Sequence, residues 1–206
     1  PFGERTFLRT DLYNQYAPFF SEFWRKLRSG DSLAYSWNVG MGSNFWALYA
    51  YYLASPFNFL VVFVPQTHII EFMTALIVIK IGLSGFTFAW YLNRHFGEPG
   101  QNPSYGITCF GVLYALSGYM AAYSWNIMWL DCLILLPLIL LGAERLVREG
   151  KWVMYTVTLG LCILTNYYIS IMICIFLVLY FGMFLITEYY LSLIHISEPT
   201  RLALIS

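Results

Sequence analysis

The segment Thr10–Phe20, TDLYNQYAPFF, places one carboxylate and two carboxamides among tyrosines and phenylalanines. Asp11 could accept the proton of an attacking hydroxyl group, because a carboxylate within hydrogen-bond reach can act as a general base. Asn14 and Gln15 could bind hydroxyl groups through their amides. The alternative for Asp11 is structural, either as a helix N-cap or as a loop acid paired with Arg9.

Cations flank this segment on both sides. Arginine suits a phosphate ligand because its planar guanidinium can bind two oxygens at once. For each arginine, the alternative is that a long side chain reaches out to lipid headgroups. The candidates for anion binding are Arg5, Arg9, Arg25 and Arg28.

A second acid, Asp131, falls within an apolar stretch, close to Asn126 and Trp129. An acid inside a membrane is costly and usually faces a cavity or a partner. Asp131 therefore either lines a site or pairs with a cation. Lys80 lies in another apolar stretch, and we expect it to pair with a neighbouring helix rather than with a lipid phosphate. Glu71 is too distant along the same helix to be that partner.

The composition excludes a soluble domain. The chain has 206 residues, of which 59% are hydrophobic and 11% charged, whereas soluble proteins have about 45–50% and about 25%. The net charge is zero, so no nucleic-acid partner is indicated.

The four cysteines lie in apolar segments without CxxC spacing, which predicts buried thiols rather than a metal site or a disulfide framework. The glycines of WNVGMGSN, residues 37–44, lack the strand and the third glycine of a dinucleotide-binding loop.

An amphipathic helix is predicted over Pro18–Gly30. Its aromatic residues recur at helical spacing, and its charged residues, Glu22 to Arg28, fall on the opposite face. Pro18 suits the first turn and Gly30 the stop. A basic, aromatic helix of this kind is expected to lie in the headgroup region.

Three regions follow from these patterns. Residues 1–66 form an outer loop, in which the apolar stretch Phe45–Pro65 is interrupted by Ser55 and Pro56 and is a broken, re-entrant or interfacial pair of helices. Residues 67–190 form a transmembrane bundle of about five spans, since stretches of about 20 apolar residues can cross a bilayer. The predicted spans are 68–92, 105–124, 127–146, 152–167 and 168–188.

Loop charge predicts the orientation. The loops that contain Arg94, Arg145, Arg148 and Lys151 lie on one side, and an excess of cations marks the cytoplasm. The turns at 124–126 and 166–168 then face outwards. If Phe45–Pro65 does not cross the membrane, the N-terminal segment also lies outside, where its cations oppose the charge rule. Either the first forty residues are cytoplasmic, or these cations face an anion at the outer leaflet.

Both ends predict a fragment. The chain begins at Pro1 instead of methionine, and the tail Leu191–Arg201, LSLIHISEPTR, resembles a translated sequencing adapter. We therefore expect 191–206 to be an artefactual tail, the alternative being a natural amphipathic one.

Four stretches resemble the bacterial YfhO-type membrane protein family. They are PFGERTFLRTDLYNQYAPFF, WNVGMGSNFWALYAYYLASPFNFL, WLDCLILLPLILLGAERL and TNYYISIMICIFLVLY. The first two are specific in order and spacing, whereas the later two are mostly apolar. The family is similar to GT-C glycosyltransferases, which transfer a sugar from a polyprenyl-phosphate lipid outside the cytoplasmic membrane. The resemblance implies an all-α, polytopic helical bundle with an interfacial helix in the first outer loop.

The resemblance also implies roles for the candidate residues. Asp11 occupies the place of the acid in the first outer loop and would be the base. The acceptor would be a cell-envelope polymer of the teichoic-acid type. The arginines would hold the lipid phosphate, and polar groups at the outer helix ends would hold the sugars. These substrate-binding candidates are Arg5, Arg9, Asn14, Gln15, Tyr16, Arg25, Arg28, Asn38, Asn44, Asn126, Asp131, Asn166 and Tyr167.

The metal and the overall function have alternatives. Asp11 is followed by Leu12 instead of a second acid, and there is no DxD motif, so no metal ligand is assigned and a divalent cation stays open. A lipid or polysaccharide transporter, or a non-catalytic scaffold for envelope assembly, is the alternative to the enzyme. A transporter needs a site near the midplane, whereas an enzyme needs its polar groups at one membrane face.

Overall fold

The structure is a computed structural model that describes residues 11–97 and 104–202, with side chains up to Thr187. Helices dominate these residues, and the only strands among them form a short hairpin. The predicted all-α fold of a membrane protein is therefore confirmed.

The N-terminal segment folds as one helical rod. A π-helix, η1 (Leu12–Tyr16), continues into α1 (Ala17–Ser29), which has a proline in its first turn. Gly30 ends α1 with a φ of 71°, a left-handed conformation that glycine adopts without a steric penalty. The predicted helix and both of its boundary residues are confirmed. The predicted polar face differs, because Glu22 and Lys26 are buried.

A hairpin covers these two side chains. Strand β1 (Tyr35–Ser36) pairs antiparallel with β2 (Ser43–Asn44), and the chain folds back over α1 so that Lys26 Nζ donates to the carbonyls of Ser32 and Tyr35, each at 2.8 Å. The charged face of α1 therefore meets protein instead of solvent, which helical periodicity alone does not reveal.

The next segment is broken where the sequence predicts. Helix α2 (Phe45–Leu48) and the π-helix η2 (Tyr49–Leu53) precede Ser55, and the 3-10 helix η3 (Pro56–Phe63) follows it. The two halves are bent by 104°. The proline has no amide hydrogen to continue the first helix, so the break is confirmed and has a local cause.

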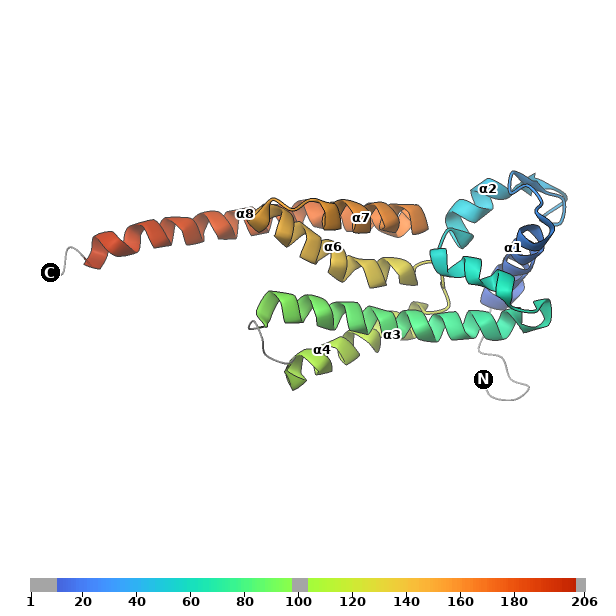
Figure 1. Cartoon of the computed structure of the whole chain (residues 1–206), viewed down its shortest axis with the longest axis horizontal. Coiled ribbons are helices and arrows are strands. Elements are labelled where there is room, and N and C mark those ends of the chain that lie inside the picture. Colours follow the sequence, from blue (N-terminus) through green and yellow to red (C-terminus); the bar gives the residue numbers. More distant parts are fainter. Residues whose placement is uncertain (1–10, 98–103, 203–206) are drawn as a thin grey trace.

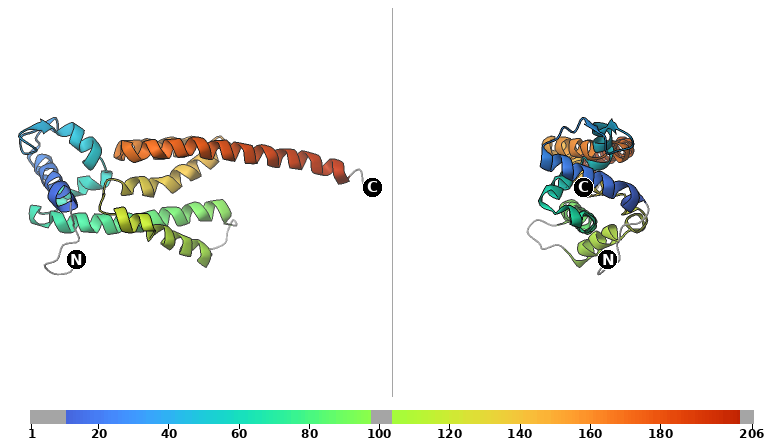
Figure 2. Two further views of the ribbon diagram at one scale, coloured as in Figure 1. Left: turned by 180° about the vertical axis from the view of Figure 1, so that it is seen from behind. Right: turned by 90° about the vertical axis from the view of Figure 1, so that its right-hand side faces the viewer.

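Five longer helices and one short one form the bundle. After η4 (Gln66–His68), they are α3 (Ile69–Phe96), α4 (Tyr105–Ala115), α5 (Gly118–Tyr123), α6 (Leu130–Glu149), α7 (Val153–Thr165) and α8 (Tyr167–Leu202). Helix α3 packs against α4 and α6, and α6 packs against α7. The N-terminal rod and hairpin sit together at one end of the bundle, next to the start of α3 and the turn between α7 and α8 (Figures 1 and 2).

Among the residues that the structure describes, three helical segments are long and apolar enough to cross a membrane: Gln66–Phe96, Tyr105–Tyr123 and Tyr167–Thr187. The bent pair of α2–η2 and η3 would make a fourth if it counts as one span. Helix α7 has 13 residues, about 20 Å at 1.5 Å per residue, which is shorter than the hydrocarbon core. The chain is a membrane protein by these segments, and the count of about five spans stays a prediction.

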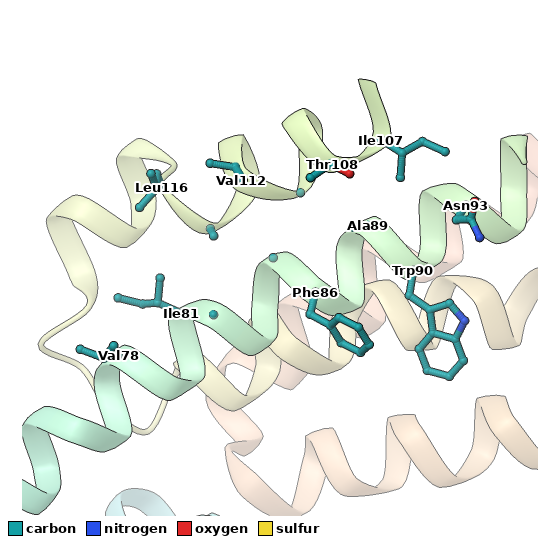
Figure 3. A pocket seen from close by; sticks show the side chains of 14 residues that line it. Val78, Ile81, Phe86, Ala89, Trp90, Asn93, Ile107, Thr108, Val112 and Leu116 are labelled. Carbon is teal, nitrogen blue, oxygen red and sulfur yellow. The ribbon is translucent and has the colours of Figure 1, made fainter. Parts of the chain in front are cut away.

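Helices α3 and α4 approach closely through small residues. A Cβ atom on Gly85 would lie 2.8 Å from the carbonyl oxygen of Gly111, so neither position has room for a side chain. Small residues of this kind let membrane helices pack backbone to backbone. Beside this crossing lies a groove of about 820 Å³, lined mainly by apolar side chains such as Ile81, Phe86 and Val112 (Figure 3).

Candidate functional site

Asp11 stands at the start of the N-terminal rod. It occupies the N-cap position of η1, yet its side chain makes no capping hydrogen bond, and the residue is exposed. No ion pair joins Asp11 to the residues described by the structure. Asp11 therefore occupies the N-cap position that the alternative predicted, but it does not make the hydrogen bond of an N-cap. Arg9, the other suggested partner, lies outside the described residues, as does Arg5.

Tyr16 lies one π-helical turn after Asp11. Its hydroxyl donates to Asn126 Oδ1 over 3.1 Å in a buried contact. Burial raises the pKa of the Tyr16 phenol, and the charges of Tyr52 and Asp11 raise it further. Tyr16 therefore stays a neutral hydrogen-bond donor, and Asp11 lies near enough to influence it.

A cluster of tyrosines and amides extends from Tyr16 towards the bundle. We define this tyrosine–amide cluster as Gln15, Tyr16, Tyr51, Tyr52, Asn126, Asn166 and Tyr167. The ring of Tyr52 contacts those of Tyr16 and Tyr51, with centroids 5.3 and 4.6 Å apart. Gln15 Nε2 donates to the Tyr52 hydroxyl over 3.3 Å.

The turn between α7 and α8 completes this cluster. Asn166 Nδ2 donates to the carbonyl of Tyr51 over 3.4 Å, and Tyr167 places its ring 5.8 Å from that of Tyr51. Asn166 Oδ1 also accepts the amide of Ile169 over 2.9 Å and so caps α8. Asn166 therefore has a structural role at the start of α8 as well as a place in the cluster.

Five predicted site residues thus meet in three dimensions although they come from three parts of the chain. They are Gln15, Tyr16, Asn126, Asn166 and Tyr167. The Asn126 Nδ2 atom is buried without a hydrogen-bond partner among the described residues. A buried amide donor without a partner is costly, and it could be satisfied by the hydroxyl oxygen of a ligand.

Asp131 is buried and paired with a cation. It forms a 2.6 Å ion pair with Lys80, and the two side chains are 3% and 0% exposed. Ser55 Oγ donates to Asp131 Oδ1 over 2.9 Å, and Lys80 Nζ also donates to the carbonyl of Ile127 over 3.1 Å. The pairing expected for Lys80 is confirmed. Because its charge is neutralised and enclosed, Asp131 acts here as a bridge between α3, α6 and the broken segment.

The predicted arginines of α1 serve the fold around Glu22. Arg25 binds both Glu22 oxygens at 2.9 Å, and its Nη1 lies 2.6 Å from Asp31. Asn38 Nδ2 donates to Glu22 over 3.0 Å, and Ser36 Oγ does so over 2.6 Å. The Arg25 hydrogen bond, with those of Ser36 and Asn38, outweighs burial and lowers the pKa of Glu22 to about 2. Arg25 and Asn38 are therefore occupied by an internal carboxylate.

The remaining predicted residues are dispersed. Arg28 Nε donates to the carbonyl of Val62 over 3.2 Å, and its guanidinium lies 5.2 Å from the centre of the Trp24 ring. Asn44 caps α2 by accepting the amide of Trp46 over 3.0 Å. Asn14 is exposed, with no hydrogen bond to the described part of the chain. The 13 residues of α1 separate Arg28 from the Asp11 end by about 20 Å, so the structure does not bring Arg25 and Arg28 to the acid.

Two members of the site were missed by sequence reasoning. Tyr51 and Tyr52 carry the ring contacts of the cluster, but in the sequence they are ordinary aromatic residues of an apolar stretch. Ser55 was interpreted only as part of a helix break, although its hydroxyl bridges Lys80 and Asp131. The only signal was that a serine beside a proline interrupts an otherwise apolar run.

The described side chains contain no group of three His, Cys, Asp or Glu residues that could hold a metal ion. The apolar groove of Figure 3 runs along α3 and α4 and includes none of the predicted site residues. The candidate site therefore consists of an exposed acid and a cluster whose members Tyr16, Asn126 and Asn166 are buried.

The comparisons with known proteins give one match. A family model described as bacterial membrane protein YfhO matches residues 1–205. No curated protein matches the chain, and no solved structure matches it.

Proposed function

The chain belongs to the YfhO family of bacterial membrane proteins, and on this premise we propose that it is a membrane glycosyltransferase. The donor is a sugar carried on a polyprenyl phosphate in the cytoplasmic membrane. The acceptor is a hydroxyl group of a cell-envelope polymer of the teichoic-acid type, on the outer face. The support for this proposal comes from the geometry around Asp11.

The observation that carries the proposal is the state of Asp11. Near the N-terminal rod, Glu22 and Asp31 are bound to Arg25, and Asp131 is bound to Lys80. Asp11 is exposed, lies beside Tyr16 and has no ion pair among the described residues. A general base must be able to reach its substrate, and Asp11 meets this requirement better than those three carboxylates.

The reaction balances with Asp11 as the only protein base. The acceptor oxygen attacks the anomeric carbon, and the bond from that carbon to the phosphate oxygen breaks. The acceptor proton passes to the Asp11 carboxylate, and the polyprenyl phosphate leaves with the bonding electron pair. The tyrosine–amide cluster would orient the sugar, since its member Tyr16 lies near Asp11 and its rings offer flat apolar faces.

The arginines nearest to Asp11 in the sequence are the candidates for binding the donor phosphate. Arg25 is bound to two carboxylates and Arg28 lies at the far end of α1. We assign the donor phosphate to Arg9 and Arg5, which precede Asp11. This assignment is made on sequence position alone, because both residues lie outside the described part.

The test is Asp11→Asn in the protein expressed from its complete gene and placed in proteoliposomes with a polyprenyl-phosphate sugar. Loss of a general base costs about 10²–10⁴-fold in rate, so sugar transfer should fall by that factor while the protein stays folded. Asp31→Asn is the matched control, because it removes another exposed carboxylate at the same end and should leave the rate nearly unchanged. Undiminished transfer by Asp11→Asn would end the assignment of the base.

The same assay separates the alternative functions. Movement of a labelled lipid across the bilayer without sugar transfer would favour a transporter. The buried Lys80–Asp131 pair would then be its intramembrane charge, although no described cavity opens onto it. Absence of both activities would favour a scaffold.

A further inference from the structure

A polar cavity, separate from the apolar groove of Figure 3, lies at the end of the bundle opposite to Asp11. It has a volume of about 380 Å³ and is formed by the last turns of α3 and α6 and the first turn of α7. Trp90 and Arg94 line it from α3, and Arg145 and Arg148 line it from α6. The pairs are spaced four and three residues apart, so each pair shares one face of its helix.

Two arginines of this cavity, Arg94 and Arg145, have few partners among the described residues. Arg94 is exposed and forms no hydrogen bond or ion pair with the described residues. Arg145 makes only long contacts, at 3.8 Å to a Glu149 oxygen and at 3.8 Å to the Met154 sulfur. Arg148 lies over the ring of Phe184, 5.1 Å from its centre.

The acids of the cavity are already bound. Glu144 accepts hydrogen bonds from the hydroxyls of Tyr91 and Tyr180 at 2.8 and 2.7 Å, and His95 Nδ1 lies 2.8 Å from its other oxygen. Glu149 lies 2.8 Å from Lys151. Three arginines and two carboxylates line the cavity, so its lining carries one net positive charge.

We propose that this cavity binds a phosphate group. Guanidinium groups from two helices can surround a tetrahedral anion with several donors, and each can bind two of its oxygens. Basic pockets between membrane helices hold anionic headgroups in this way. Trp90 and Leu141 form an apolar wall of the cavity, and Trp90 also lines the apolar groove along α3 shown in Figure 3. A lipid could therefore place its phosphate among the arginines and its chains in that groove.

The site is independent of the proposed sugar transfer. It lies at the opposite end of the bundle from Asp11 and shares no residue with the tyrosine–amide cluster. Its ligand is either the phosphodiester of an anionic lipid or free phosphate, since both present the same oxygens. The two sources differ in whether binding needs lipid chains.

The experiment measures lipid retention by native mass spectrometry of the whole purified chain in detergent. Phosphatidylglycerol and phosphatidylcholine are added separately, and retention should strongly favour phosphatidylglycerol. Arg94→Ala should weaken that retention about tenfold, the equivalent of one charge-assisted hydrogen-bonded pair. Arg94→Lys should retain phosphatidylglycerol less well than the unaltered chain and better than Arg94→Ala, because it keeps the charge and loses the planar guanidinium.

Arg28→Ala is the control. It removes one exposed arginine from the opposite end of the bundle and none of the residues that line the cavity, and it should retain phosphatidylglycerol like the unaltered chain. Equal losses for Arg94→Ala and Arg28→Ala, or equal retention of the two lipids by the unaltered chain, would overturn the proposal.

A second arm separates the two phosphate sources. Phenylglyoxal modifies accessible arginines, and bound phosphate should protect Arg94 and Arg145 from it. Protection by inorganic phosphate alone indicates a site for the phosphate group itself, and protection only by phosphatidylglycerol indicates a lipid-headgroup site. Lack of protection by either would contradict phosphate binding.

Discussion

The two ends of the helical bundle use their charged side chains in opposite ways. At the N-terminal end, Glu22 holds Arg25, and Asp11 is the carboxylate without an ion pair among the described residues. At the other end, Glu144 and Glu149 are bound, and Arg94 is the cation without one. Glu22 and Asp131 are buried and paired with cations. For the charges without an ion pair we propose ligand roles, a base at the N-terminal end and an anion site at the other end.

The largest expected effect concerns a pair that the fold uses. Lys80→Ala should destabilise the protein by about 3–5 kcal/mol, because it leaves the buried Asp131 charge without its partner. The measurement is thermal unfolding in detergent. The double variant Lys80→Met with Asp131→Leu removes both charges and should recover most of the loss. A single variant as stable as the unaltered chain would show that the pair is not structural.

The next effect concerns Glu22. Glu22→Gln removes the charge that holds Arg25, Ser36 and Asn38 and should cost about 1–3 kcal/mol. Proteolysis within the hairpin, residues 31–44, should become faster. Asp31→Asn is the control, because Asp31 binds Arg25 at an exposed position and should matter less.

The pH dependence of the same contact has a definite sign. Folding lowers the pKa of Glu22 from 4.5 to about 2, chiefly through the Arg25 hydrogen bond. The unfolded state then binds more protons between these values, so this stabilisation is full above about pH 4.5 and is lost as the pH falls towards 2. The hairpin should become protease-sensitive in that window, and Glu22→Gln should show less of this change.

These predictions also show how far sequence reasoning reaches. Spacing of apolar residues and the positions of Pro18 and Gly30 predicted α1, and Ser55–Pro56 predicted the break, because helix periodicity, capping and proline effects are local. The burial of Glu22 and Lys26 was not predicted, since it depends on a hairpin that folds back over the helix.

The candidate site was predictable in its residues more than in its arrangement. Asn126, Asn166 and Tyr16 were chosen as polar groups near predicted helix ends, and the structure brings them together. The grouping of Arg25 and Arg28 with Asp11 followed from sequence proximity, and the length of α1 keeps them apart. Distances along a helix can be worked out from sequence, whereas the partners of Lys80 and Tyr52 depend on packing between distant segments.

A smaller effect is expected within the tyrosine–amide cluster. Tyr16→Phe removes the hydrogen bond to Asn126 and should lower stability by about 1–2 kcal/mol, since it leaves the buried amide with no partner. Thermal unfolding measures this loss. Gln15→Ala breaks a longer, half-buried bond and serves as the comparison. Equal losses of stability in the two variants would show that the buried contact between Tyr16 and Asn126 contributes no more than the half-buried one.

The smallest effect on stability belongs to Asn14. This exposed residue makes no hydrogen bond with the described residues, so Asn14→Ala should change stability by less than about 0.5 kcal/mol. Any fall in sugar transfer by this variant would then report substrate contact. Unchanged transfer would remove Asn14 from the site while leaving Asp11 in place.

The difference between the two ends has meaning only if they lie on opposite sides of the membrane, with Asp11 outside. Single cysteines at Asn14 and at Lys151, in a chain whose four native cysteines are replaced by alanine, can be reacted with a membrane-impermeant maleimide on intact cells. We expect the Asn14→Cys protein to react at once and the Lys151→Cys protein to react only after the cells are permeabilised. The reverse pattern would place Asp11 in the cytoplasm and contradict the proposed reaction.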